Sequence, residues 1–139
     1  MTLPSIDLRF HHLGLATRDA DETSRMLHAM GYTLAESLFD PLQNVNLIWC
    51  EHDTMPAIEV VYPADSPGPL GSYLAEFSEM VYHLCYVADD IQAAVASIRA
   101  IGARVLPVAP PKPAVLFDGR QVGFYLVKGL GLIEILEEK

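Results

Sequence analysis

The chain has 139 residues, of which 51% are hydrophobic and 19% charged, which is typical of a globular domain and excludes an intrinsically disordered chain. Its formal net charge is −9 and no basic run occurs, so we expect neither nucleic acid nor an anionic membrane surface as a partner. The opening residues, MTLPSIDLRF, lack the apolar core of a signal peptide, and no apolar run is long enough to span a bilayer. These features predict a cytoplasmic protein.

Hydrophobic periodicity and turn residues predict two series of elements, each made of one strand, one helix and three more strands. The first series comprises a strand at 10–17, a helix at 19–30, and strands at 32–39, 45–51 and 57–63. Asp19 is the expected N-cap of the helix, and Gly31 is expected to end it. We expect Met26, Leu27 and Met30 to form its buried face.

A connector at 64–79 follows, and its second part, SYLAEFSE, is predicted to form a short helix. The second series comprises a strand at 81–88, a helix near 90–101, and strands at 104–109, 121–127 and 132–138. The proline-rich segment PPKPAVLFDGR is expected to be a loop before the strand at 121–127. Cys50 and Cys85 lie in apolar strand-like segments without CxxC spacing, which favours buried thiols over a disulfide between them.

The two series are copies of one unit. Five identical residue pairs are 71 positions apart, namely His12 and His83, Leu13 and Leu84, Asp19 and Asp90, Ala29 and Ala100, and Gly31 and Gly102. Matches at a fixed offset indicate an internal duplication. We therefore predict one α+β domain over residues 1–139, built from tandem βαβββ modules at 9–63 and 80–138. A helix covers one face of each sheet, so the two bare faces are expected to enclose a shared cleft.

Four ionisable residues lie in the middle of apolar strand faces, which is costly unless they have partners. Because side chains alternate along a strand, each shares its face with apolar neighbours. Each module supplies one histidine from its first strand and one glutamate from its last: His12, Glu59, His83 and Glu134. A single divalent cation bound by all four would satisfy them, and such a mixed N/O site suits Zn, Ni, Co, Fe or Mn. His11 has no counterpart in the second copy and is interpreted as an ordinary strand residue.

At this point the sequence resembles the vicinal oxygen chelate, or glyoxalase, superfamily over nearly its whole length. The segments HLGLA, YHLCYVADDIQAA and GLIEILE resemble most closely the methylmalonyl-CoA epimerase-like branch, and AIEVVYPADSP resembles that family's IELLEP segment. Residue by residue, the resemblance makes His12, Glu59, His83 and Glu134 the metal ligands. It implies a metal-dependent isomerase, epimerase or lyase that removes a proton beside a carbonyl through a metal-stabilised enediolate.

The same resemblance implies roles for further residues. Glu134 is the first candidate for ligand and base together, and Asp40, in DPLQNV, is the nearest candidate for a second acid. Gln43, Trp49, Phe124 and Arg120 are expected to contribute to the substrate site. The loop before the strand at 121–127 reads LFDGR where epimerases carry a GAHGK-like loop, so Arg120 is either a grip for a carboxylate or phosphate or a solvated loop cation.

The substrate is expected to be a small carbonyl compound or an acyl thioester, and the resemblance implies a homodimer. Three other functions use the same fold: a non-catalytic, antibiotic-type binding protein, an extradiol dioxygenase, and a tailoring or accessory protein in a biosynthetic pathway. The full set of four ligands favours the enzyme over the binding protein. Their distribution, two from each copy, disfavours the dioxygenase, which needs two histidines and one carboxylate.

Overall fold

The computed structural model describes residues 5–139, which form two compact units. The N-terminal unit is His12–Tyr82, and the C-terminal unit combines the described residues that precede His12 with His83–Lys139. Two α-helices and a set of mixed parallel and antiparallel strands confirm the predicted α+β class. Within residues 5–139, no helix is both long enough and apolar enough to cross a membrane.

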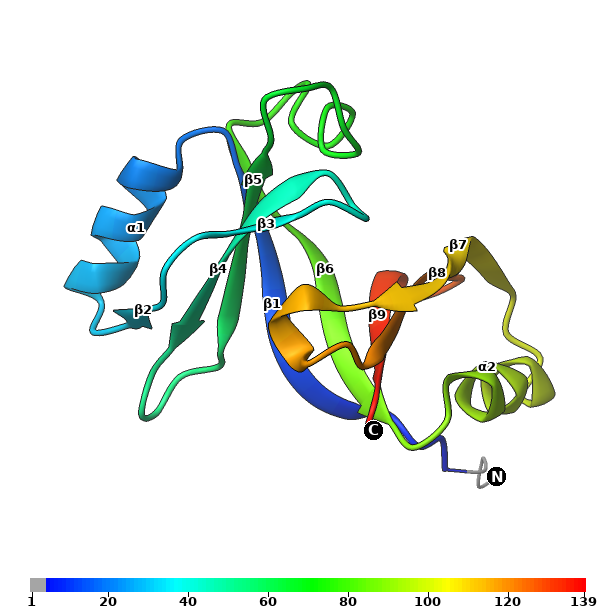
Figure 1. Ribbon diagram of the computed structural model, residues 1–139. Helices are drawn as coiled ribbons and strands as arrows, with labels where there is room; N and C mark the ends of the chain where they lie inside the picture. Colours follow the sequence, from blue (N-terminus) through cyan, green and yellow to red (C-terminus); the bar gives the residue numbers. More distant parts are fainter. Residues whose placement is uncertain (1–4) are drawn as a thin grey trace. The chain divides into compact units, whose positions relative to one another are not determined.

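The N-terminal unit follows the expected strand–helix–strands pattern. Its elements are β1 (Arg9–Thr17), α1 (Ala20–Ala29), β2 (Thr33–Leu34), β3 (Leu38–Asp40), β4 (Val45–Glu51) and β5 (Ile58–Pro63). The strands are ordered β2-β4-β5-β1, with β3 also paired to β4. β1 and β5 are parallel, whereas β4 and β5 are antiparallel. Helix α1 lies beside β2 and β5 (Figure 1).

The C-terminal unit repeats this arrangement. Its elements are β6 (Glu79–Ala88), α2 (Ile91–Ala100), β7 (Val105–Pro113), the 3-10 helix η1 (Val115–Phe117), β8 (Gln121–Val127) and β9 (Gly131–Glu137). The strands are ordered β6-β9-β8-β7, and the first and last strands are again parallel neighbours. Helix α2 lies beside β7 and β9 (Figure 1). The common order of strands supports the duplication that the repeat in the sequence indicates.

Both helices begin in the same way. The Asp19 side chain accepts a hydrogen bond from the Glu22 N–H at 3.0 Å, and Asp90 does the same for Ala93 at 3.0 Å. These contacts satisfy backbone donors that have no partner within a helix, and they confirm Asp19 as the N-cap. The predicted buried face of α1 is wrong in part, because Leu27 is buried while Met26 and Met30 are 61% and 41% exposed.

Each sheet has one face covered by its own helix. In the N-terminal unit, Leu27 of α1 packs with Ile48, Cys50, Ile58 and Val60. In the C-terminal unit, Ile91, Val95 and Ile98 of α2 pack with Tyr125, Ile133 and Ile135. Since side chains alternate along a strand, the residues between these core positions point to the face away from the helix.

Three sequence expectations require correction. The predicted strand at 32–39 is interrupted. Leu34 lies opposite Cys50 and Leu38 opposite Leu47, so between these two pairs the chain has one residue more than its partner strand β4. The extra residue makes a bulge. The predicted loop at 110–120 is strand up to Pro113, because β7 pairs on one side only within its unit and proline is tolerated on such a strand. The predicted helix at 72–79 does not form: turns continue to Glu76, one of them closed by the Leu74 N–H on the Leu70 carbonyl at 2.9 Å, and Glu79 already belongs to β6.

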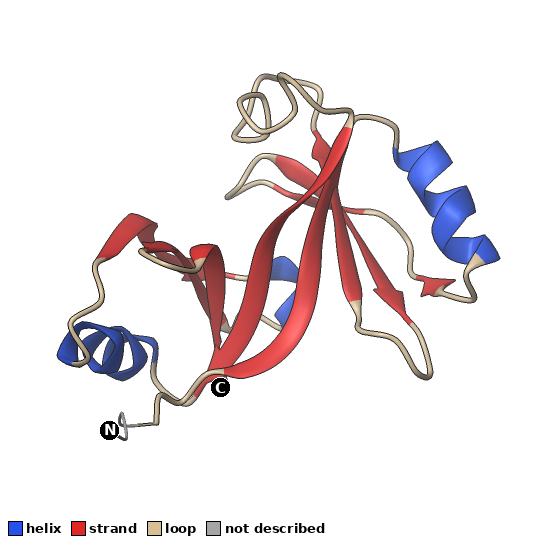
Figure 2. Ribbon diagram, turned by 180° about the vertical axis from the view of Figure 1, so that it is seen from behind, coloured by secondary structure: helices blue, strands red, loops and turns tan. Residues whose placement is uncertain are grey.

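The connector between β5 and β6 is the long coil drawn in tan in Figure 2. It is attached to the N-terminal unit through Asn44, whose side-chain amide donates to the Ser66 hydroxyl at 3.1 Å and to the Pro67 carbonyl at 3.0 Å. Gly68 approaches this residue so closely that an added Cβ would lie 2.9 Å from the Asn44 carbonyl oxygen. A side chain at position 68 would therefore push the connector away from its anchor.

Candidate functional site

The N-terminal unit buries a histidine and a glutamate on the sheet face away from α1. His12 on β1 and Glu59 on β5 are 0% and 5% exposed, and the His12 Nε2 atom is 3.9 Å from the Glu59 carboxylate. The parallel pairing of the two strands places Glu59 opposite Gly14, two residues after the histidine. The pair is therefore set by the register of the sheet.

The C-terminal unit contains the equivalent pair. His83 on β6 and Glu134 on β9 are 2% and 3% exposed, and the His83 Nε2 atom is 3.3 Å from the Glu134 carboxylate. Glu134 lies opposite Cys85, which is again two residues after the histidine. Residue types, burial and strand register are thus the same in both pairs.

An aromatic ring accompanies each histidine. In the N-terminal unit, Trp49 lies opposite Glu59 across the ladder. Its ring centroid is 5.1 Å from that of His12, and the angle between the two ring planes is 84°. In the C-terminal unit, Phe124 lies opposite Glu134. Its ring centroid is 5.3 Å from that of His83, and the interplanar angle is 83°. Both contacts are edge-to-face, so each unit presents the same group of histidine, glutamate and aromatic residue.

The chemistry of these side chains fits a divalent transition metal. All four are buried, and each offers one ligand atom, an imidazole nitrogen or a carboxylate oxygen. A buried carboxylate is costly without a compensating charge, and neutral imidazole with carboxylate is a usual ligand combination for Zn, Fe, Co, Ni and Mn. A cation held by these residues would supply that charge.

Asp40 ends β3, and Gln43 lies in the turn between β3 and β4. The Asp40 carboxylate is 1% exposed and accepts hydrogen bonds from the Leu42 N–H at 2.9 Å and the Gln43 N–H at 3.3 Å. The Gln43 side-chain amide donates to its other oxygen at 3.0 Å. Asp40 therefore organises the turn, and Gln43 is held by it.

Arg120 follows η1 and is attached to the end of β9. Its Nε donates to the Glu137 carbonyl at 2.7 Å, and its guanidinium is 3.9 Å from the Glu138 carboxylate. The side chain is 27% exposed. These contacts tie the loop before β8 to the C-terminal strand, which is a structural task that the sequence alone did not indicate.

His11, half-buried on β1, forms with His12 and Cys85 a second group of side chains that could hold a metal ion. Its ring meets that of Phe117 edge-to-face at 5.3 Å, within the C-terminal unit. Neither Cys50 nor Cys85 forms a disulfide and both are buried, as expected. Burial raises the pKa of the Cys50 thiol to about 11, so this thiol is protonated at neutral pH.

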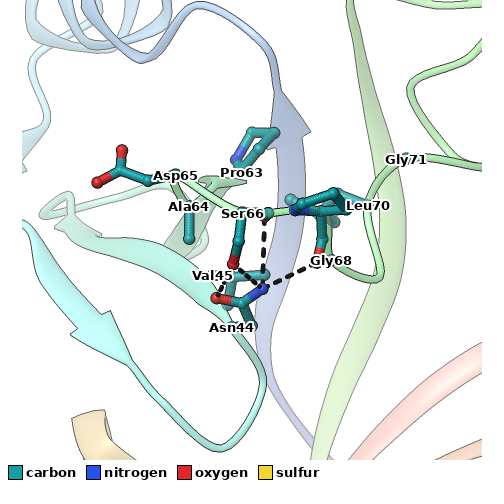
Figure 3. A pocket seen from close by; sticks show the side chains of 10 residues that line it. Asn44, Val45, Pro63, Ala64, Asp65, Ser66, Gly68, Leu70 and Gly71 are labelled. Atoms are coloured by element: carbon teal, nitrogen blue, oxygen red, sulfur yellow. Dashed lines mark hydrogen bonds between the residues drawn. The ribbon is translucent and has the colours of Figure 1, made fainter.

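Sequence reasoning did not find the small hollow of about 280 Å³ under the connector. Figure 3 shows Asn44, Pro63, Ser66, Gly68 and Leu70 around it, with the Asn44 amide directed at the turn that begins with Ser66. None of its lining residues is a predicted site residue. The only signal in the sequence is the run of small and proline residues in ADSPGPLG, which predicts a loop but not a hollow.

The paired sites and the duplicated βαβββ arrangement define the class of protein. Residues 11–124 match the model of the glyoxalase/bleomycin resistance protein/dioxygenase superfamily, and the chain belongs to that family. This confirms the resemblance seen in the sequence and the glyoxalase-type fold.

Several relatives share a narrower name. An ethylmalonyl-CoA/methylmalonyl-CoA epimerase of Cereibacter sphaeroides is 27% identical over 108 residues, which cover 75% of this chain and 78% of that protein. The crystal structure of methylmalonyl-CoA epimerase from Mycobacterium tuberculosis matches with a TM-score of 0.79 at 18% identity, covering 99% of this chain and 93% of the other. A Streptomyces coelicolor methylmalonyl-CoA epimerase variant in complex with 2-nitronate-propionyl-CoA matches with a TM-score of 0.72 at 23% identity, covering 96% and 98%.

Proposed function

We propose that this protein is a metal-dependent isomerase or epimerase that moves a proton on the carbon beside a carbonyl group. The observation that carries the proposal is the buried His–Glu pair, which occurs once in each unit at the same strand register. A fold can retain one such pair for packing reasons. Keeping both copies, with four costly side chains, is better explained by a shared task.

The shared task we propose is the binding of one divalent cation by His12, Glu59, His83 and Glu134. Zn, Ni, Co, Fe and Mn all accept two imidazoles with two carboxylates, and the donor set does not select among them. When bound, the cation would supply Lewis-acid stabilisation of negative charge that develops on the substrate's carbonyl oxygen.

Glu134 is proposed as the proton-transferring base. Its carboxylate lies on an almost fully buried part of β9 with His83 Nε2 at 3.3 Å, which restricts its orientation. A positioned carboxylate in a water-poor environment can accept the proton of a carbon acid directly. Asp40 is the proposed second acid, and because Gln43 donates to its carboxylate, that amide would have to adjust during proton transfer.

An acyl thioester is the first substrate to test. The relative from Cereibacter sphaeroides is named for ethylmalonyl-CoA and methylmalonyl-CoA, and the Streptomyces coelicolor structure contains 2-nitronate-propionyl-CoA. Arg120 could hold a phosphate of a CoA thioester, but it is already attached to the end of β9. Smaller 2-oxo compounds, which do not need such a contact, are therefore the second group to test. Gln43, Trp49 and Phe124 are the proposed contacts for the substrate.

Solvent deuterium exchange tests this function without knowledge of the product. The protein, loaded in turn with Zn, Ni, Co and Mn, is incubated in D₂O with racemic acyl-CoA thioesters and with 2-oxo compounds, and exchange is followed by NMR. We expect exchange at the carbon beside the carbonyl for at least one substrate. Glu134→Gln should slow it at least a hundredfold, whereas Glu51→Gln, at an exposed end of β4, should not. Absence of exchange with every metal and substrate would favour a binding protein instead.

We also propose that the chain forms a homodimer. The last strand of the C-terminal sheet, β7, exposes Leu106 by 62% and Val108 by 53%. Exposed apolar side chains that gather on one strand mark interaction surfaces more often than isolated ones do. Sedimentation equilibrium should give twice the chain mass for the wild type and a single chain mass for a Leu106→Glu, Val108→Glu variant. A monomeric wild type would contradict the proposal.

A further inference from the structure

Trp49 and Phe124 occupy equivalent positions in the two repeats. They are 75 residues apart, as are Glu59 and Glu134. Each lies opposite the glutamate of its own unit in the antiparallel ladder. Each therefore belongs to the same face and the same row of residues as the proposed ligands.

The contact with the histidine is also the same in both units. The ring centroids are 5.1 Å and 5.3 Å apart, and the interplanar angles are 84° and 83°. Core aromatic residues are common on strands, but agreement in register, distance and angle between two rings of different chemistry indicates a constraint on the histidine rather than on the aromatic residue.

The constraint concerns the rotation of the imidazole. The χ2 torsion of histidine is broad, so strand register alone fixes where the ring lies but not which way its nitrogen atoms point. An edge-to-face contact has a defined geometry and resists rotation of the partner ring. In both units the ring that is held in this way directs Nε2 towards the carboxylate of the same unit.

We infer that Trp49 and Phe124 are positioning residues, each of which holds the ligand histidine of its own repeat with Nε2 directed at the metal. The inference rests on the proposed metal site and goes beyond it, because it assigns these residues a role in metal binding in addition to the substrate contact proposed above. Groups that orient metal ligands typically change metal affinity by 10- to 100-fold when they are removed. A pure substrate contact would leave metal affinity unchanged.

Cobalt binding to the full chain tests the inference in the C-terminal unit. Co²⁺ is titrated into metal-free protein, and its visible absorption bands report both affinity and ligand geometry. We expect Phe124→Leu to weaken Co²⁺ binding about tenfold and to change the band positions, while Phe124→Tyr, which restores a ring, should bind like the wild type. Tyr125→Leu is the matched control, since Tyr125 is the next residue on β8 but packs on the opposite face against the helix core.

The N-terminal unit offers a second, independent readout. Trp49 is the single tryptophan of the chain, and its ring is in contact with that of His12. Co²⁺ bound through His12 should therefore quench the intrinsic fluorescence of the wild type at the same concentrations that develop the absorption bands. Trp49→Leu should weaken Co²⁺ binding as Phe124→Leu does, and Trp49→Phe should restore it.

The outcomes separate the two proposals. A wild type that develops no cobalt bands and no quenching would overturn the metal site, and the inference with it. A wild type that binds Co²⁺, together with Phe124→Leu and Trp49→Leu variants of unchanged affinity and spectrum, would overturn the inference alone. If Phe124→Leu fails to fold, Phe124→Met gives the same comparison with a more adaptable side chain.

Discussion

At the scale of residues, this chain deals with buried ionisable groups in two ways. Asp40 is the last residue of β3, next to a turn whose backbone N–H groups are available, and its carboxylate is satisfied by neighbours two and three positions away. His12, Glu59, His83 and Glu134 lie in strands, where the backbone donors of the element already serve the sheet. Their side chains depend on other strands for partners, which is why they are candidates for metal ligands and Asp40 is not.

This difference predicts distinct effects for substitutions at position 40. Asp40→Ala removes the acceptor for the Leu42 and Gln43 N–H groups, so we expect a loss of about 1–3 kcal/mol in the free energy of unfolding. Urea denaturation measures it. The same variant should keep its bound metal. If the variant lost its metal and kept its stability, Asp40 would contribute to metal binding and not to the turn, which would contradict this prediction.

The buried Cys50 thiol gives a prediction about pH. Burial raises its pKa from 9.0 to about 11, so the folded state retains the thiol proton between these values while the unfolded state loses it. The contribution of this thiol to stability is therefore complete below pH 9 and declines as the pH rises towards 11. Urea midpoints measured across this range should fall more steeply for the wild type than for Cys50→Ala. If the urea midpoints of both proteins fell equally with pH, the pKa of the Cys50 thiol would not be raised by burial, which would contradict the prediction.

At the scale of elements, strand register determines most of the site. Each glutamate lies opposite the residue two positions after its histidine, and each aromatic residue lies opposite its glutamate. A shift of one residue in either sheet would turn the glutamate onto the helix face. The connector is different: the Asn44 side chain, the buried Leu70 and Leu74, and a backbone hydrogen bond from the Arg18 N–H to the Ser78 carbonyl hold it instead of a ladder.

The connector contacts predict a selective effect for Asn44. This residue adopts a left-handed conformation with φ of 55° and donates hydrogen bonds to the turn at 66–67. Asn44→Asp keeps the shape and tolerates this conformation but cannot donate, so we expect faster proteolytic cleavage within 64–78 and unchanged metal content. Asn46→Asp, on β4, is the control, as it alters an amide that bonds only to Pro63 among the contacts described. Equal cleavage of both variants would contradict the anchoring role of Asn44.

At the scale of the whole molecule, the repeat in the sequence explains what the sequence can predict. The fixed 71-residue offset between His12 and His83 identifies the repeat, and the apolar patterns give the class and the paired ligand candidates. The bulge near residues 35–37 could not be predicted, because it arises from unequal numbers of residues on paired strands. The strand at Pro110–Pro113 was missed because proline is unfavourable in central strands, and only the sheet order shows that β7 has one paired side within its unit.

Side-chain contacts were the least predictable feature. The attachment of Arg120 to the Glu137 carbonyl joins segments 17 residues apart, and nothing in LFDGR indicates it. The edge-to-face contacts of Trp49 and Phe124 also depend on register between strands. Sequence patterns give the face on which a residue lies, but they do not give its neighbour across the ladder.

The central claim is that one divalent cation is bound jointly by the two repeats, and metal stoichiometry tests it most directly. Co²⁺ or Zn²⁺ per chain is measured by plasma mass spectrometry after equilibrium dialysis, for the wild type, for His12→Asn and His83→Asn, and for the control His28→Asn, at an exposed position of α1. We predict one metal ion per chain in the wild type and the control, and almost complete loss in each of the other two variants. Two ions in the wild type with one lost per variant, or no ion at all, would contradict a shared site.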